Sequence, residues 1–170
     1  MSLIDSHSGA SVGIGYIHNK IHNGKMYYWN YKFTSVASAT GAFVYVTIPA
    51  GVKVHYYAEY FSSSGGVLDA YKSPTVSANG TQVSALNYDS DVTIQPKSKA
   101  YATPTVTANG TAFRSVGIGG GTAVAGNSST GHGEQRLELL VGPGTYLLNL
   151  KPLADTSTVI FDIAFYEEEE

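Results

Sequence analysis

The sequence contains no cysteine. This absence excludes disulfide bonds, thiolate metal sites and a thiol nucleophile. Charged residues are also scarce, at 14% of the 170 residues, against about 25% in an average soluble protein. The net charge of −3 provides no attraction for nucleic acid or for an anionic membrane, so we expect neither as a partner. A surface with so little charge favours association of the chain with its own copies or with another surface.

Long apolar runs and helical periodicity are missing as well. No window approaches the roughly 20 apolar residues that a membrane helix requires. The residues after Met1 include Asp5 and His7 and no apolar run, so we expect no cleaved secretory signal. No segment has a clear 3.6-residue period, which predicts almost no helix.

The centre of the chain carries one twelve-residue motif twice. AYKSPTVSANGT at Ala70–Thr81 returns as AYATPTVTANGT at Ala100–Thr111. In each copy a proline fixes φ, an extended Thr-Val run follows, and Asn-Gly is a strong turn signal. Each copy therefore predicts a shaped loop between strands rather than a catalytic element.

Alternation of apolar and polar residues predicts strands along most of the chain. The turn Pro49-Ala50-Gly51 predicts a hairpin over Ala42–Phe61, and six glycines within Gly119–Gly133 predict a long loop. The predicted strands are Met26–Phe33, Ala42–Ile48, Val52–Phe61, Val67–Tyr71, Gln82–Tyr88, Asp91–Gln95, Thr111–Ile118, Glu134–Val141, Thr145–Leu150 and Thr158–Tyr166.

Many short strands with frequent turns indicate an all-β fold, a β-sandwich of the jelly-roll or Greek-key type. We expect an N-terminal arm at residues 1–24, the sandwich at 25–167 and an acidic tail at 168–170. The residues predicted to form the core are Trp29, Phe33, Val44, Val54, Phe161, Ile163 and Phe165.

The five histidines raise the possibility of a metal site. His18 and His22 are four positions apart, which places them on one face only in a helix. Gly24 and the neighbouring asparagines argue against a helix there. We therefore expect no metal and no other cofactor.

Catalytic patterns are weak. No serine lies in Gly-x-Ser-x-Gly, and Gly117–Gly121 lacks the Lys-Ser/Thr of a phosphate-binding loop. A glycosidase-like carboxylate pair could be drawn from several acidic residues, but nothing favours one pair. We expect no enzymatic activity. The acidic candidates are Glu59, Asp69, Glu134 and Glu138.

Aromatic residues, thirteen of them tyrosines, allow two interpretations. They could form sugar-stacking platforms, or they could fill a core and subunit interfaces. We favour core and interface, and the sequence leaves the sugar-binding alternative open.

Several segments between His18 and Glu167 occur in a familiar order. Ile21-His22-Asn23-Gly24 precedes an aromatic strand, and the Tyr-x-x-Pro-Thr-Val-x-Ala-Asn-Gly-Thr unit is doubled. Gly144–Leu150 and the closing strand Phe161–Glu167 follow. Together they resemble a family of small structural proteins of tailed bacteriophages and prophages that decorate the capsid. The chain departs from that family in the acidic segment Leu86–Asp91 and in Phe165, where tryptophan is common.

The resemblance implies a capsid decoration, or cement, protein. Such a protein is a homo-oligomer, a trimer by preference, that binds the major capsid protein on the virion surface and is made in the host bacterial cytoplasm. The alternative is a carbohydrate-binding or host-adhesion module on the phage head or tail. Candidate contacts between subunits or with the capsid are His22, Pro74, Val76, Asn79, Pro104, Val106 and Asn109.

Overall fold

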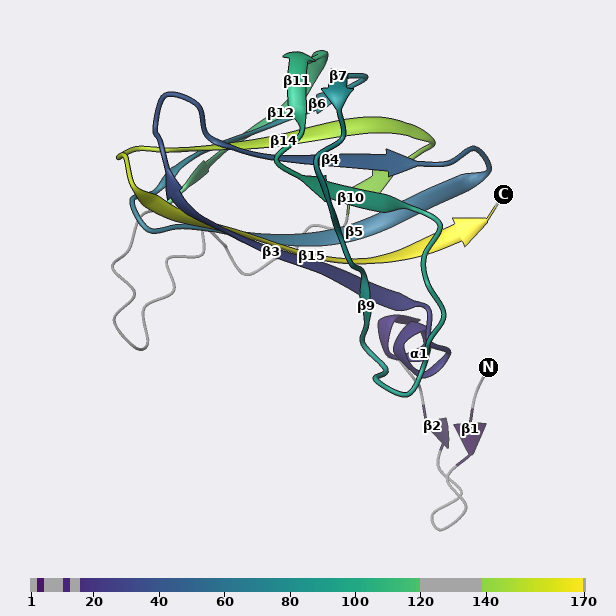
Figure 1. Ribbon diagram of the computed structural model, residues 1–170. Coiled ribbons are helices and arrows are strands. Elements are labelled where there is room, and N and C mark those ends of the chain that lie inside the picture. The colour runs from purple at the N-terminus through teal and green to yellow at the C-terminus, as the bar shows by residue number, and fades with distance from the viewer. Residues whose placement is uncertain (1–2, 5–10, 13–15, 120–138, 170) are drawn as a thin grey trace.

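Two antiparallel β-sheets packed face to face form the body of the molecule (Figure 1). The computed structural model describes residues 3–4, 11–12, 16–119 and 139–169. The predicted all-β sandwich with almost no helix is confirmed, because α1 (Tyr16–His22) is the one helix in these ranges. No helix in this part of the chain has the length and apolarity needed to cross a membrane.

The strands fall into two large sheets and two small pairs. The five-stranded sheet has the order β13 (Leu139–Val141), β5 (Val52–Ser62), β15 (Ser157–Glu169), β3 (Met26–Val36), β9 (Leu86–Asn87). The six-stranded sheet has the order β12 (Thr111–Ile118), β6 (Gly66–Lys72), β14 (Gly144–Pro152), β4 (Ala42–Ile48), β10 (Lys99–Ala102), β8 (Thr81–Val83). The small pairs are β7 (Thr75–Ala78) with β11 (Thr105–Ala108), and β1 (Leu3–Ile4) with β2 (Ser11–Val12).

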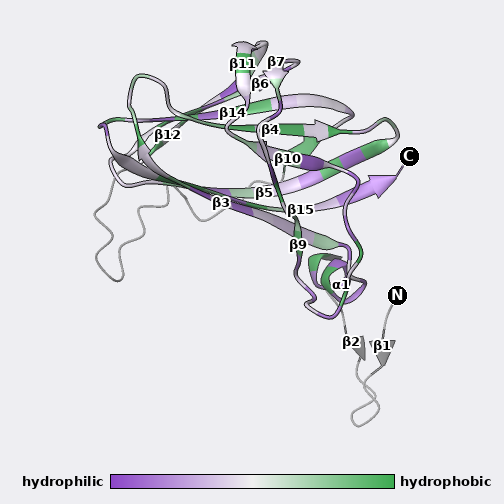
Figure 2. Cartoon of the chain, viewed as in Figure 1, coloured by the Kyte–Doolittle hydropathy of each residue, from purple (hydrophilic) through white to green (hydrophobic). Residues whose placement is uncertain are grey.

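The core lies between the two large sheets, and all seven core residues predicted from the sequence are buried in it. The prediction succeeded because side chains alternate between the faces of a strand, so period-two patterning identifies the inward face. This alternation of apolar and polar residues is visible along the strands (Figure 2). Trp29 stacks on Phe165 with ring centroids 4.0 Å apart.

The predicted hairpin over Ala42–Phe61 is wrong. β4 pairs with β14 and β10 in one sheet, whereas β5 pairs with β15 and β13 in the other. The turn at Pro49-Ala50-Gly51 therefore carries the chain from one sheet to the other. Two alternating strands and a tight turn are common to both arrangements, so local patterning does not distinguish them. The weak strand predicted at Asp91–Gln95 is also wrong, because these residues form no strand.

The helix α1 lies in the region predicted to be an arm without helix. Gly24, at φ 63°, donates its N–H to the carbonyl of Ile21 at 2.8 Å, and Lys25 donates to Lys20 at 2.9 Å. This is the hydrogen-bond pattern that ends a helix at a left-handed glycine. Gly24 thus terminates the helix, and the prediction that it excludes a helix is wrong. Ile17 and Ile21 pack on the outer face of the five-stranded sheet.

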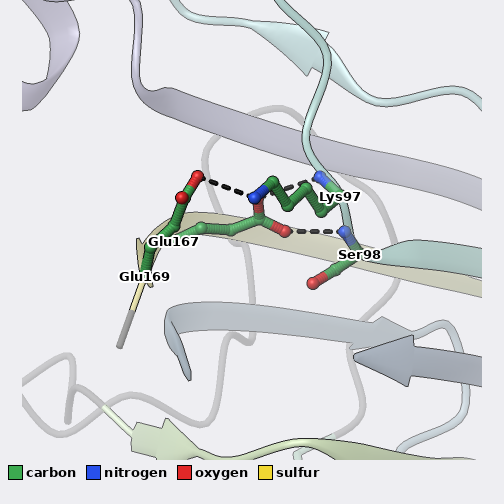
Figure 3. Close-up of polar contacts among 4 residues, drawn as sticks. All are labelled: Lys97, Ser98, Glu167 and Glu169. Atoms are coloured by element: carbon green, nitrogen blue, oxygen red, sulfur yellow. Dashed lines mark hydrogen bonds and ion pairs between the residues drawn. The ribbon is translucent and has the colours of Figure 1, made fainter. Parts of the chain in front are cut away.

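The C-terminal strand continues beyond the predicted boundary at Glu167, because Glu168 and Glu169 pair with β5. The Glu167 carboxylate accepts the N–H of Lys97 at 2.9 Å and of Ser98 at 2.7 Å (Figure 3). Nζ of Lys97 lies 2.9 Å from Glu169 and lowers the pKa of that carboxyl. We call Glu167 and these two amides the β15 clamp. It ties the chain entering β10 to the end of β15.

Candidate functional site

The two copies of the repeat pair with each other. β7 from the first copy and β11 from the second form an antiparallel ribbon in which Val76 lies opposite Val106. Their flanking strands also pair across the copies, β6 with β12 and β10 with β8. The ribbon lies on the side of the six-stranded sheet that faces away from the other sheet (Figure 1). We call the paired β7 and β11 the ribbon.

Two corners redirect the chain out of the sheet and into the ribbon. Ser73 and Thr103, each directly before a proline, have φ of 57° and 55°. Such left-handed conformations cost about 1–2 kcal/mol for residues other than glycine. The corner N–H groups are satisfied by the two central strands, because Ser73 donates to the carbonyl of Thr145 at 2.9 Å and Thr103 to that of Phe43 at 3.2 Å. The same strained corner thus occurs in both copies.

The Asn-Gly turns place each end of the ribbon against the opposite corner. A Cβ on Gly80 would lie 2.1 Å from the carbonyl oxygen of Ala102, and one on Gly110 would lie 2.3 Å from that of Lys72. β7 therefore starts beside β6 and ends beside β10, and β11 returns in the opposite direction. Since β14 and β4 lie between β6 and β10, the ribbon crosses over these two strands.

A row of large side chains runs beneath this crossing. Tyr71, Leu147, Tyr45 and Tyr101 are register neighbours on four adjacent strands. They lie on the outer face, yet Leu147 is 0% exposed and Tyr45 only 7%. Tyr71 and Tyr101 occupy equivalent positions in the two repeats. The burial of this row indicates that the ribbon packs against it.

Reciprocal hydrogen bonds join the two ribbon strands. The hydroxyl of Ser77 donates to the carbonyl of Thr105 at 3.4 Å, and that of Thr107 donates to the carbonyl of Thr75 at 3.1 Å. Ser77 and Thr107 are equivalent residues of the two copies. No charged residue lies in either strand, so the ribbon presents a neutral surface.

The predicted contact residues divide by exposure. Asn79 and Asn109 are exposed at the ends of the ribbon, and His22 is exposed on α1. Pro104 is buried, while Pro74, Val76 and Val106 are half-buried. The Pro-Val part of each repeat is therefore not an exposed apolar surface. The outward surface of the ribbon instead consists of exposed Thr75, Ser77, Ala78, Thr105, Thr107 and Ala108.

The turn signals of each repeat predict two separate loops and do not predict that the two copies pair. The duplication itself is the signal that could have predicted it. Two near-identical extended segments, each bounded by Pro and Asn-Gly, can form an antiparallel pair with matching ends. The structure brings together Pro74, Val76, Asn79 and their second-copy equivalents, while His22 lies apart from them on α1.

The two candidate catalytic carboxylates within the described residues, Glu59 and Asp69, do not converge. Glu59 lies on the outer face of the five-stranded sheet, and Asp69 on the outer face of the six-stranded sheet. Asp69 accepts a hydrogen bond from Ser115 at 2.7 Å, which is an ordinary surface contact. Glu134 and Glu138 lie outside the described residues. Among the residues placed by the structure, no group of three or more His, Cys, Asp or Glu could hold a metal ion.

A small apolar cavity of about 30 Å³ lies between the sheets, with exposed Phe113 among its lining residues. Its volume corresponds to about two water-sized groups, which is too small for a sugar ring. Burial raises the pKa of Tyr56 on its wall against the opposing effect of Arg114. Burial likewise raises the pKa of nearby Tyr60. Both hydroxyls therefore remain protonated at neutral pH and are not poised as bases.

In comparisons with known proteins, no family model and no curated protein matches this chain. The function is therefore inferred from the residues and their arrangement.

Proposed function

We propose that this chain is a capsid decoration, or cement, protein. It binds the major capsid protein as a trimer on the outer surface of a bacteriophage head and stabilises the shell. The resemblance of residues 18–167 to phage head proteins supports this proposal. The structural observation that carries it is the ribbon. It consists of two uncharged strands, one from each repeat, that project from the outside of the β-sandwich.

The ribbon has the properties of a preformed contact surface. Its two corners and its two glycine turns are held by close backbone contacts. Its exposed side chains are small and uncharged. A surface with few rotamers to immobilise loses little conformational entropy on binding. Such a surface suits repeated attachment to a regular protein lattice.

We further infer a jelly roll. The order β13-β5-β15-β3 in one sheet and β12-β6-β14-β4 in the other supports it. Successive strands alternate between the sheets at β3–β4, β4–β5, β5–β6, β12–β13, β13–β14 and β14–β15. In this arrangement β7 to β11 are an insertion between β6 and β12. The insertion adds β8 and β10 to one sheet and β9 to the other.

The proposal is tested by co-sedimentation of the protein with undecorated, expanded capsids of its phage. Val106 is a candidate contact, but Val106→Asp would be a poor probe, because half-buried Val106 also contributes to packing. Ala108→Glu instead adds charge at an exposed position of the ribbon. We expect it to weaken capsid binding by about tenfold or more, because an interface carboxylate loses its hydration without gaining a partner.

Ala154→Glu is the matched control. Ala154 is also exposed, but it follows the opposite end of β14 from the ribbon corners, so this variant should bind capsids as the wild type does. Wild-type protein that fails to sediment with capsids would refute the decoration function. Binding to host glycans in that case would establish the adhesion alternative. The candidate sugar-stacking platform would be exposed Tyr88, whose ring lies beside that of Tyr28.

A further inference from the structure

Two histidines meet on the exposed side of α1. His18 and His22 lie one helical turn apart, and their Nε2 atoms are 2.9 Å apart. The ring centroids are 4.4 Å apart, with an angle of 77° between the planes. Both side chains are exposed. A spacing of four residues places both rings on one face only in a helix, and α1 spans both residues.

The distance between the two nitrogens matches a chelating pair. Two metal–nitrogen bonds of about 2.0–2.1 Å that meet at a right angle place the nitrogens about 2.9 Å apart. A right angle between neighbouring ligands is typical of tetragonal Cu²⁺ and Ni²⁺ sites. The tetrahedral angle preferred by Zn²⁺ would require a separation of about 3.3 Å. The observed spacing therefore fits the first two ions better than Zn²⁺.

We propose that His18 and His22 form a two-histidine site for a divalent transition metal, with Cu²⁺ bound more tightly than Ni²⁺ or Zn²⁺. Cu²⁺ forms the most stable complexes of the divalent first-row metals with nitrogen ligands. Two protein ligands leave further coordination positions for water or for a donor from another protein. This inference is independent of capsid binding.

The helix is held in place by contacts that need no metal. Ile17 and Ile21 pack against the sheet, and Asn87 donates a hydrogen bond to the Gly24 carbonyl at 2.8 Å. Gly24 itself lies so close to Val92 that a Cβ would be 2.6 Å from Val92 Cγ1. A metal would thus bind a preformed pair, and its removal should leave the fold unchanged.

The competing explanation is an N–H···N hydrogen bond between the two rings, without special affinity for metal. Titration of the tag-free full chain with Cu²⁺, followed by calorimetry and by electron paramagnetic resonance, separates the two. We expect one equivalent of Cu²⁺ with a two-nitrogen hyperfine pattern. Removal of a direct ligand in His18→Gln or His22→Gln should weaken binding by about tenfold or more.

His55→Gln is the matched control, because His55 is a histidine of β5 that stacks on Tyr166 and lies near Glu168. Tyr166 in turn packs with Ile17 and Ile21 of α1, so docking of the helix is checked in this variant too. His55→Gln should leave copper binding unchanged. The NMR shifts of the Ile17 and Ile21 methyl groups show whether α1 stays docked in each variant. The proposal is overturned if wild-type protein binds Cu²⁺ no more tightly than the two variants, or if binding falls only in variants whose helix has undocked.

Discussion

Gly110 and Gly51 both have positive φ, at 86° and 74°, but they differ in their surroundings. A Cβ on Gly110 would collide with the backbone of Lys72 and Ser73, whereas one on Gly51 would have nothing within 4 Å. At Gly110 both the positive φ and the close backbone contacts require glycine, whereas at Gly51 only the positive φ does. Comparing alanine substitutions at Gly110 and Gly51 therefore measures how much the close packing at the ribbon corner contributes to stability.

We therefore predict that Gly110→Ala lowers the free energy of unfolding by more than about 3 kcal/mol, since strain from a left-handed alanine adds to a backbone collision. Gly51→Ala should cost about 1–2 kcal/mol from conformation alone. Chemical denaturation of both variants measures the difference. Equal losses would show that the ribbon end can move away from the corner without cost.

At the scale of elements, the β15 clamp joins segments that are far apart in sequence. Glu167 receives two backbone N–H groups with its two carboxylate oxygens, and it is half-buried. Glu169, two residues further on the same strand, makes an exposed ion pair, with side-chain exposures of 55% for Lys97 and 70% for Glu169. Hydrogen bonds to a partly buried carboxylate contribute more than exposed ion pairs do.

We predict that Glu167→Gln destabilises the protein by about 1–2 kcal/mol, because the amide NH₂ group must face one of the two N–H donors. Hydrogen exchange at the Lys97 and Ser98 amides should accelerate in this variant. Glu169→Gln serves as the control and should change stability little. If both variants behave alike, the clamp contributes no more than a surface ion pair.

At the scale of the whole molecule, the two outer faces of the sandwich are covered differently. The ribbon packs over the six-stranded sheet, and α1 packs over one end of the five-stranded sheet. Most large aromatic side chains are in the core or under these coverings. This distribution agrees with the interpretation of the aromatic residues as packing groups, and it leaves the neutral ribbon as the candidate surface for assembly.

We predict that the wild-type protein sediments as a trimer, at three times the 18.0 kDa of one chain. Sedimentation velocity over a range of concentrations, supported by light scattering, measures this directly. Ala154→Glu should remain a trimer as well. A monomer at all concentrations would contradict the oligomer part of the proposal, and the capsid experiment would then decide binding separately.

The sequence alone was sufficient to predict most of the long strands, their inward faces and the scarcity of helix, but not the short strands β7, β10 and β11. It could do so because the direction of a side chain along a strand depends only on the local backbone. Trp29, Phe33 and Phe165 were therefore placed in the core correctly.

The tertiary structure sets which strands pair. β4 and β5 are adjacent in sequence, yet each pairs with a strand more than ninety residues away. The tertiary structure also decided the pairing of the two repeats, which turned predicted loops into the ribbon, and the helix that unites His18 with His22. The strand pairings depend on segments remote in sequence, which local patterning does not specify. The helix ends at the left-handed Gly24, a local signal that a turn would share.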